Sequence, residues 1–481
     1  MTRTRHIVVV GHGMVGARFA EEVAARDPRG ERVRLTLVGA EPEGPYNRVL
    51  LSEAVNGQLR PEELALPEVA APNVTARSGV AATALDRTAR RVHLDDGGEL
   101  DYDELVLATG ADPVFPPVRG LTDAGGRPAD GVTALRDMAD CRRVRELSRA
   151  GSPLVVLGGG VLGLEAARGL NEAGARVALV EGAPWLMRRQ LGREAAGILA
   201  ERFRSLGVQV HTWRVAERWV PGRGLELDDG RTLAADGVVV TAGVRARTGL
   251  AADSGLAVDH GVPVGDTLAT ADPRVHAIGD CAQHPGGGAG LVAPGWEMAR
   301  VLADLLTGSD PGARYTGSRD ITRLKAAGVD LTALGAAEPG EDAETVTVSD
   351  PGGGRYAALS VRHGRVAGAV LLGFPEAAAT IGSLYTDDAP VPEDRLALLV
   401  GGDRSEADTG TDSGGGDATV CHCNAVTRGQ LESAWLEGAR TRCDLAERTR
   451  ATTGCGSCTR DVDAFVSAMS DRDTTPVPAA T

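Results

Sequence analysis

The chain has 481 residues, 42% of them hydrophobic and 24% charged, which is the composition of a soluble globular protein with several domains. Its formal net charge of −15 argues against a nucleic acid or an anionic membrane as partner. No segment approaches the roughly 18 consecutive apolar residues of a membrane span, and the N-terminus lacks a signal-peptide pattern, so we expect a cytoplasmic protein. Lys325 is the single lysine, and we attribute this to coding bias toward arginine.

The first predicted unit combines a strand, a glycine turn and a helix. An apolar run over 6–10 leads into Gly11-His12-Gly13-Met14-Val15-Gly16, and a helix and a second strand over 34–39 follow. In such a turn the first glycine permits the tight bend, the second lets the backbone approach a pyrophosphate, and the third lets the helix pack on the strand. The turn therefore predicts a dinucleotide site. Glu41 is the candidate acceptor for a ribose hydroxyl, with a solvated loop acid as the alternative.

The same arrangement returns in the middle of the chain. A strand over 154–157 leads into Gly158-x-Gly160-x-x-Gly163, and a helix and a strand ending on Glu181 follow. A carboxylate at this position suits the free 2′-hydroxyl of NAD and repels the 2′-phosphate of NADP, so we expect NADH rather than NADPH. Further buried strands are predicted directly before Thr109-Gly110, before Gly243 and before Gly279-Asp280.

Four of the seven cysteines lie close together near the C-terminus. They form the pairs Cys421-x-Cys423 and Cys455-x-x-Cys458. Four thiolates can hold a [2Fe–2S] cluster, a [4Fe–4S] cluster or a structural zinc ion. C-x-C spacing is less usual for tetrahedral zinc, and a flavin bound at the first dinucleotide turn would need an acceptor for single electrons, so we favour iron–sulfur and [2Fe–2S] in particular. We expect Cys443, outside both pairs, to be a packed thiol.

These motifs together resemble the electron-input half of NAD(P)H-dependent assimilatory nitrite reductase large subunits. They are also similar to electron-transfer flavoprotein subunits of assimilatory nitrate reductases, within the pyridine nucleotide-disulfide oxidoreductase-like superfamily. The matching stretches are Gly11–Gly16, Tyr46–Ser52, Leu107–Gly110, Gly158–Ala167, Ala277–Ala282, Leu291–Gly295 and Leu324–Asp330. The C-terminal cysteines resemble the bacterioferritin-associated ferredoxin (BFD) type of [2Fe–2S] domain, and residues 315–400 resemble the C-terminal domain of rubredoxin reductases.

The resemblance implies an α/β fold with two Rossmann-like three-layer domains, a small α+β domain and a small helical BFD-like domain. The divisions we expect are an FAD domain (1–120 and 241–312), an NAD domain (121–240), a rubredoxin-reductase-like domain (313–400), a flexible linker (401–418), a cluster domain (419–470) and a disordered tail (471–481).

The resemblance also implies roles for single residues. FAD would be held by Gly11, Gly13, Met14, Val15, Gly16, Glu41, Arg48, Thr109, Gly110, Gly279 and Asp280, with Arg48 against the flavin. NADH would be held by Gly158, Gly160, Gly163, Glu165, Glu181 and Gly243, with Glu165 near the nicotinamide. Glu165 and Arg48 are the candidate catalytic residues, and Cys421, Cys423, Cys455 and Cys458 are the metal ligands.

We therefore expect an NADH-dependent oxidoreductase that passes electrons through FAD and the cluster to a separate nitrate or nitrite reductase. Full-length nitrite reductases continue into a sirohaem and [4Fe–4S] half; no cysteine follows Cys458, so we expect no nitrite reduction by this chain alone. Two alternatives stay open, a ferredoxin- or rubredoxin-type reductase for another acceptor and a redox-sensing flavoprotein with structural zinc. The oligomeric state also stays open, a homodimer included.

Overall fold

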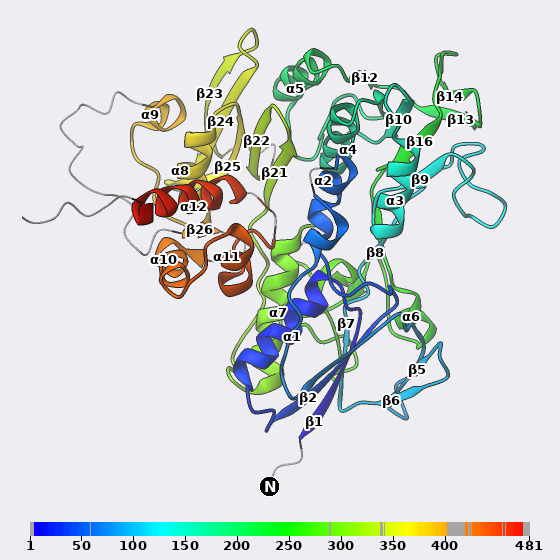
Figure 1. The fold of residues 1–481 in the computed structure, drawn as a ribbon, viewed down its shortest axis with the longest axis vertical. Helices are drawn as coiled ribbons and strands as arrows, with labels where there is room; N and C mark the ends of the chain where they lie inside the picture. Colours follow the sequence, from blue (N-terminus) through cyan, green and yellow to red (C-terminus); the bar gives the residue numbers. More distant parts are fainter. Residues whose placement is uncertain are drawn as a thin grey trace, which may run out of the picture.

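The computed structural model describes residues 4–57, 59–287, 290–336, 340, 342–401, 419–421, 424, 426–454, 456 and 458–474. Three five-stranded sheets and a small helical module make up this part of the chain (Figure 1). The expected linker residues 402–418 and the predicted metal ligands Cys423 and Cys455 lie outside the described residues. None of the described helices is long and apolar enough to cross a bilayer.

The first domain is built on a parallel sheet. In spatial order its strands are β19 (Val275–Ala277), β7 (Glu104–Leu107), β1 (Arg5–Val10), β2 (Val33–Gly39) and β3 (Val74–Ser78). Helices α1 (Met14–Arg26) and α7 (Val292–Thr307) lie side by side against it (Figure 1). The first glycine turn follows β1, from which the chain runs to β2 on one side while β7 lies on the other. Such a switch point is where open α/β sheets bind ligands.

The second domain repeats this plan. Its parallel strands are β12 (Gln209–Thr212), β11 (Arg176–Glu181), β10 (Pro153–Leu157), β16 (Gly237–Val240) and β9 (Val132–Ala134). Alternate residues of β10 enter different cores: Leu154 and Val156 join one cluster and Val155 and Leu157 join another. Burial on both faces explains why the strand is an unbroken apolar run. Helices α4 (Val161–Glu172) and α5 (Arg193–Ser205) cover the first of these faces.

The third domain is an antiparallel sheet. In spatial order its strands are β21 (Ile321–Ala326), β22 (Val329–Gly335), β25 (Arg365–Leu372), β24 (Arg355–Arg362) and β23 (Glu344–Asp350). Helices α8 (Pro375–Thr386) and α9 (Arg395–Val400) pack on one face. On the other face Leu324 and Leu331 share a core with α4 and α5 of the second domain. The sheet therefore places β21 beside the second nucleotide-binding unit.

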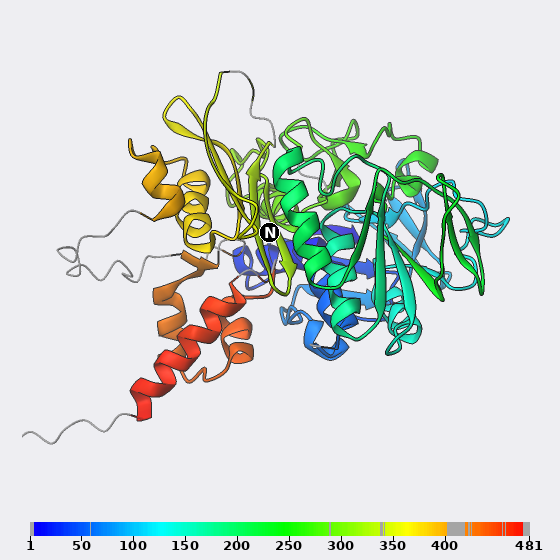
Figure 2. The same cartoon turned by 90° about the horizontal axis from the view of Figure 1, so that it is seen from above.

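A separate small module, here called the cysteine module, comprises the described residues of 419–474. Its elements are β26 (Thr419–Cys421), β27 (Val426–Thr427), α10 (Arg428–Leu436), α11 (Arg442–Thr449) and α12 (Thr459–Thr474). Capping boxes at Thr427 and Thr441 begin α10 and α11. Trp435 packs edge-on against Phe465 in the module's own core. In both views the module lies on the same side of the molecule as the third domain (Figures 1 and 2).

The remaining elements connect these units or cover their faces. They are β4 (Ala82–Asp86), β5 (Arg91–Leu94), β6 (Glu99–Asp101), β8 (Ala111–Pro113), β13 (Ala216–Val220), β14 (Gly224–Leu227), β15 (Thr232–Leu233), β17 (Val244–Ala246), β18 (Val262–Pro263), β20 (Ala282–Gln283), α2 (Leu51–Val55), α3 (Met138–Leu147), α6 (Gly249–Asp253), η1 (Arg48–Leu50), η2 (Pro61–Leu64) and η3 (Gly279–Cys281).

Two expectations about the C-terminal part differ from the structure. Cys443 is exposed, not packed, because α11 turns Leu445 into the module core and leaves Cys443 on another face. Helix α12 continues to Thr474, past the expected start of a disordered tail, since no glycine or proline interrupts the sequence before Pro476.

Candidate functional site

The first glycine turn has a shape that only glycines permit. Gly11 has φ +120°, and a Cβ atom there would lie 2.0 Å from the carbonyl oxygen of Ala108. A Cβ atom at Gly16 would lie 2.0 Å from the carbonyl oxygen of Gly11. Gly13, by contrast, has only Arg48 Nε at 3.8 Å from its missing Cβ, so its backbone faces open space. No side chain caps α1 at Gly13, which leaves the first N–H groups of the helix available to a phosphate.

The second turn has the same geometry. Gly158 has φ +121°, and a Cβ atom at Gly163 would lie 1.9 Å from the carbonyl oxygen of Gly158. The central Gly160 has no atom within 4 Å of its missing Cβ, and it begins α4 without a side-chain cap. Both turns thus combine two sterically closed glycines with one open glycine at a helix N-terminus. This is the arrangement that accepts a dinucleotide pyrophosphate.

Glu181 lies at the end of β11 and faces the second turn. Its carboxylate accepts hydrogen bonds from the backbone N–H groups of Gly159 (2.5 Å) and Ala183 (2.6 Å). The side chain is half-buried, and its fixed position across the turn is the one predicted for a ribose-binding acid. Gly243, after β16 on the neighbouring strand, has nothing within 4 Å of its missing Cβ.

Glu41 and Arg48 lie together beside the first turn. Arg48 forms an ion pair with Glu41, which also accepts a hydrogen bond from the Tyr46 hydroxyl (2.6 Å). The Arg48 guanidinium lies 4.8 Å from the Tyr46 ring centroid and donates to the carbonyl oxygen of Arg136 (3.2 Å). The structure therefore brings both predicted residues to one place, with the carboxylate of Glu41 already satisfied by protein donors.

The other predicted FAD residues surround the same edge of the first sheet. The Thr109 hydroxyl donates to the carbonyl oxygen of Arg247 (2.8 Å), and Gly110 has open space beside it. Asp280 accepts from Arg136 Nη2 (2.7 Å) and from the Gly290 N–H (3.0 Å).

The side chains of Met14 and Val15 point away from the turn into packed regions. Met14 packs with Leu66 and Trp296, and Val15 fills the space that side chains at Gly279 or Gly295 would occupy. The Met14 side chain is buried and so unsuited to contact a cofactor, whereas Val15 is only partly buried.

Glu165 and Lys325 form a buried ion pair between the domains. Glu165 Oε2 lies 3.6 Å from Lys325 Nζ and accepts from the Ser52 hydroxyl (3.2 Å), and Oε1 accepts from the Lys325 N–H (3.0 Å). Lys325 Nζ also donates to the carbonyl oxygen of Val49. Burial raises the pKa of Glu165, while the attraction of Lys325 opposes the shift. The contacts of Glu165 and Lys325 thus join α4, the 49–52 segment and β21.

Sequence reasoning missed Lys325, although it was the only lysine in a chain whose other basic side chains are arginine or histidine. It also missed Tyr46 and Arg136, the partners of Glu41 and Asp280. Nothing in the sequence marked Arg136, which lies in a connecting segment.

The two described cluster cysteines lie in the core of the cysteine module. Cys421 and Cys458 are both buried there. Cys281, after the Gly279-Asp280 turn, is also buried, and its thiol lies 3.3 Å from the carbonyl oxygen of Leu107. Burial raises the pKa of Cys281, so a reactive thiolate is not favoured there.

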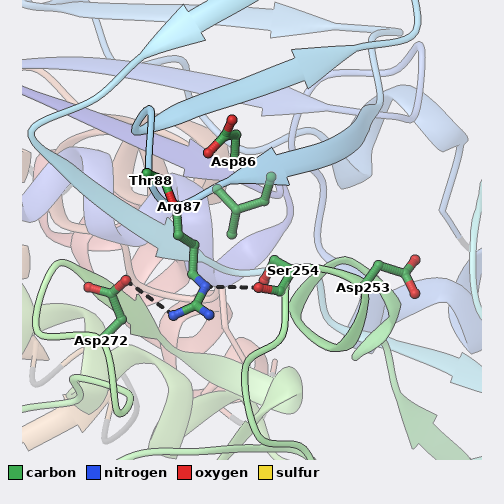
Figure 3. A pocket seen from close by; sticks show the side chains of 7 residues that line it. Asp86, Arg87, Thr88, Asp253, Ser254 and Asp272 are labelled. Carbon is green, nitrogen blue, oxygen red and sulfur yellow. Dashed lines mark hydrogen bonds and ion pairs between the residues drawn. The ribbon is translucent and has the colours of Figure 1, made fainter.

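A surface hollow between β4 and α6 has no part in this arrangement (Figure 3). Arg87 crosses it, donating to the carbonyl oxygen of Ser254 (2.9 Å) and pairing with Asp272 (3.5 Å). Asp272 precedes β19, so the hollow lies at the amino edge of the parallel sheet. Both glycine turns follow carboxyl ends of strands, which is where ligands bind in such sheets.

Comparison with known proteins agrees with this geometry. Residues 5–300 match the pyridine nucleotide-disulphide oxidoreductase family, residues 321–387 match the rubredoxin NAD+ reductase C-terminal domain, and residues 419–467 match the BFD-like [2Fe-2S] binding domain. The family implies FAD and NAD(P)H, which the open glycines fit, and the last match implies a [2Fe–2S] cluster, which the buried cysteines fit.

Individual relatives are also NAD(P)H-dependent or electron-transfer proteins by name. A nitrite reductase [NAD(P)H] from Bacillus subtilis is 33% identical over 94% of this chain and 56% of its own length. The assimilatory nitrate reductase electron transfer subunit of Bacillus subtilis is 29% identical over 100% of this chain and 61% of its own length. The chain thus spans somewhat over half of these relatives.

Among solved structures, the covalent putidaredoxin reductase–putidaredoxin complex superposes with a TM-score of 0.73 at 26% identity, covering 82% of this chain and 95% of that chain. The fold predicted from the sequence is confirmed. The chain belongs to the pyridine nucleotide-disulphide oxidoreductase family, as an NAD(P)H-dependent flavoprotein that carries a rubredoxin-reductase-type domain and a BFD-like [2Fe–2S] domain.

Proposed function

We propose that this protein takes electrons from NADH onto FAD and passes them through a [2Fe–2S] cluster to a separate assimilatory nitrate or nitrite reductase. The observation that carries the proposal is the presence, in one chain, of two open dinucleotide turns and a cysteine module in contact with the domain that holds the first of them. The names of the Bacillus subtilis relatives support the class of acceptor.

The chemistry divides between the cofactors and the protein. FAD, when bound, accepts a hydride and gives up its two electrons singly, and a [2Fe–2S] cluster accepts one electron at a time. Each NADH becomes NAD+ and releases one proton while two one-electron acceptors are reduced. The protein has to bind the two nucleotides so that the nicotinamide lies against the flavin, and it has to keep water from the site.

Particular residues serve these tasks in the proposal. Gly13 and Gly160 admit the two pyrophosphates to the N-termini of α1 and α4. Glu165 and Arg48 are the residues that contact the nicotinamide and the flavin, and Lys325 positions Glu165. No side chain needs to transfer a proton in the hydride step.

The proposed preference for NADH rests on Glu181. Its carboxylate already accepts hydrogen bonds from Gly159 and Ala183, so it is held at the strand end beside the turn. A 2′-phosphate would bring a second negative charge to the same place, whereas a 2′-hydroxyl can donate to the carboxylate.

An anaerobic titration tests the electron path. The purified protein is assayed for iron and sulfide and titrated with NADH while the absorption spectrum and low-temperature EPR are recorded. Loss of flavin absorption together with a reduced-cluster EPR signal supports the proposal. Zinc in place of iron, or flavin reduction without an EPR signal, contradicts it and favours a redox-sensing flavoprotein.

A second candidate is a reductase for a rubredoxin or ferredoxin. The third domain supports it, because residues 321–387 match the rubredoxin NAD+ reductase C-terminal domain. Steady-state rates with a purified assimilatory nitrate reductase catalytic subunit, rubredoxin and a [2Fe–2S] ferredoxin separate the two. Faster turnover with either small protein than with the catalytic subunit would favour the second candidate.

A further inference from the structure

The cysteine module contacts the first domain through the loop that carries its second cysteine pair. Asn47 Nδ2 donates to the carbonyl oxygens of Thr453 and Gly454, both at 2.7 Å, just before Cys455. Asn47 Oδ1 accepts from the Val49 N–H (3.0 Å), which fixes the orientation of the amide. Asn47 is only 2% exposed, so these bonds are made away from solvent. They define how the loop approaches the first domain.

Packing on the other side of Cys455 is equally close. A Cβ atom at Gly456 would lie 2.9 Å from Leu50 Cδ2 and 3.8 Å from Lys325 Cδ. Gly456 therefore lies directly on the 47–50 segment and beside the lysine that pairs with Glu165. In this arrangement the loop surface that meets the first domain cannot meet another protein at the same time.

An ion pair completes the contact. Arg450 Nη1 lies 2.6 Å from Glu21 Oε1 on α1, with side-chain exposures of 24% and 14%. Arg18, one turn earlier on α1, lies 3.7 Å from Glu21 and donates to Asn424 Oδ1 (3.4 Å) in the module. Arg18 and Glu21, with Asn47 and Leu50, form what we call the docking face.

The ion pair is costly to bury on both sides. Burial raises the pKa of Glu21 to about 7 despite Arg450 and Arg18, with neighbouring Glu22 adding to the rise. Burial also lowers the pKa of Arg450, although Glu21 and Glu22 oppose that shift. Each charge therefore loses hydration in the contact, and this loss opposes the attraction between the two side chains. Such a pair fixes geometry and adds little net affinity.

We propose that the docking face is the surface at which the flavin-bearing domain passes electrons to the cysteine module. In this proposal the Glu21–Arg450 pair sets the docked geometry while keeping docking weak enough for the module to leave. This inference rests on the proposed function. Release then exposes the loop around Gly456 to the external acceptor. The module cannot contact the docking face and the external acceptor at the same time. Docking that is too weak therefore slows reduction of the cluster, and docking that is too tight slows reduction of the acceptor.

A variant cycle on the FAD- and cluster-loaded protein tests this. Glu21→Gln leaves Arg450 without its ion-pair partner, and Arg450→Gln leaves Glu21 with only the more distant Arg18. The double variant Glu21→Leu/Arg450→Met removes both charges and keeps apolar bulk. Glu432→Gln is the matched control, because Glu432 is a glutamate of the module that pairs with Arg428 of its own helix. Stopped-flow absorption follows flavin reduction by NADH, freeze-quench EPR follows the cluster, and cytochrome c serves as external acceptor.

Each single variant should slow flavin-to-cluster transfer by about tenfold, because an unpaired buried charge weakens docking. The double variant should restore that transfer yet reduce cytochrome c several-fold more slowly than wild type. Flavin reduction by NADH should stay the same in all variants and in the control. Iron content and the EPR signal after dithionite verify that each variant carries its cluster.

If the EPR signal of the reduced cluster grows at the same rate in all variants, the inference is overturned. A double variant slower than either single in cluster reduction would overturn it too, since that result indicates simple loss of structure. Absence of a cluster in dithionite-reduced wild type would instead overturn the proposed function itself. The two failures are therefore distinguishable.

Discussion

Replacing Lys325 with methionine should destabilise the protein by isolating a buried carboxylate. Lys325 Nζ lies 3.6 Å from Glu165 Oε2, and the two side chains are 15% and 5% exposed. Without the ammonium, Glu165 keeps only the backbone N–H of residue 325 (3.0 Å) and the Ser52 hydroxyl (3.2 Å) as donors. Removing one partner of a buried ion pair costs about 3–5 kcal/mol, and the partial exposure of Lys325 places the expected loss at about 3 kcal/mol.

The loss should depend on pH. Burial already raises the pKa of Glu165, and removal of the nearby ammonium raises it further. A carboxyl group whose pKa is higher in the folded than in the unfolded protein binds more protons when folded. Its contribution is therefore most favourable at low pH and is lost as pH rises through the folded-state pKa. The Lys325→Met variant should be close to wild type at pH 5 and show its full loss at pH 8.

Thermal unfolding of the FAD-loaded protein at pH 5 and pH 8 measures this loss. The control is Glu165→Gln/Lys325→Met, which leaves a neutral amide in place of the isolated charge and should melt above the single variant at pH 8. The reasoning is refuted if the single variant has the same melting temperature as wild type at pH 8, or if the double variant melts below the single variant at that pH.

Three further substitutions separate the steps of the proposed electron path. In Gly163→Ala the new Cβ would lie 1.9 Å from the carbonyl oxygen of Gly158, so NADH should no longer bleach the flavin although FAD absorption remains; saturable bleaching would show that the turn can relax. Glu181→Gln removes the charge that repels a 2′-phosphate, so the kcat/KM ratio of NADH to NADPH should fall by about tenfold or more, and an unchanged ratio would remove Glu181 from coenzyme choice. Cys421→Ser replaces a buried thiol of the module, so the reduced-cluster EPR signal should vanish while NADH still bleaches the flavin; a persisting signal would exclude Cys421 as a ligand.

Local patterns made much of this fold predictable. The turns at Gly11–Gly16 and Gly158–Gly163 each follow a strand that pairs in parallel with its neighbours, as expected from apolar runs followed by glycines. The strand predicted to end on Glu181 does end there. These features depend on residues close together in sequence, where backbone geometry and periodicity carry the information.

Contacts between distant segments could not be predicted in this way. Lys325 and Glu165 are 160 residues apart, and Arg136 and Asp280 are 144 apart. Glu41 lies two residues past the end of β2, but nothing in the sequence indicated that Tyr46 and Arg48 would occupy its carboxylate. Pairings of this kind follow from how the domains pack together, and a single sequence read by itself holds no direct record of that packing.

The environment of Lys325 gives a physical reason for a lysine at this position. A single lysine among arginines suggested only coding bias, yet its surroundings suit an ammonium better than a guanidinium. Nζ pairs with one Glu165 oxygen and donates to the Val49 carbonyl, while Gly456 of the cysteine module lies close to the side-chain stem. An ammonium has three donors on a flexible stem, whereas a guanidinium is a rigid plane with five. In this confined position we expect an arginine to leave donors unsatisfied and to press against the loop that contains Gly456.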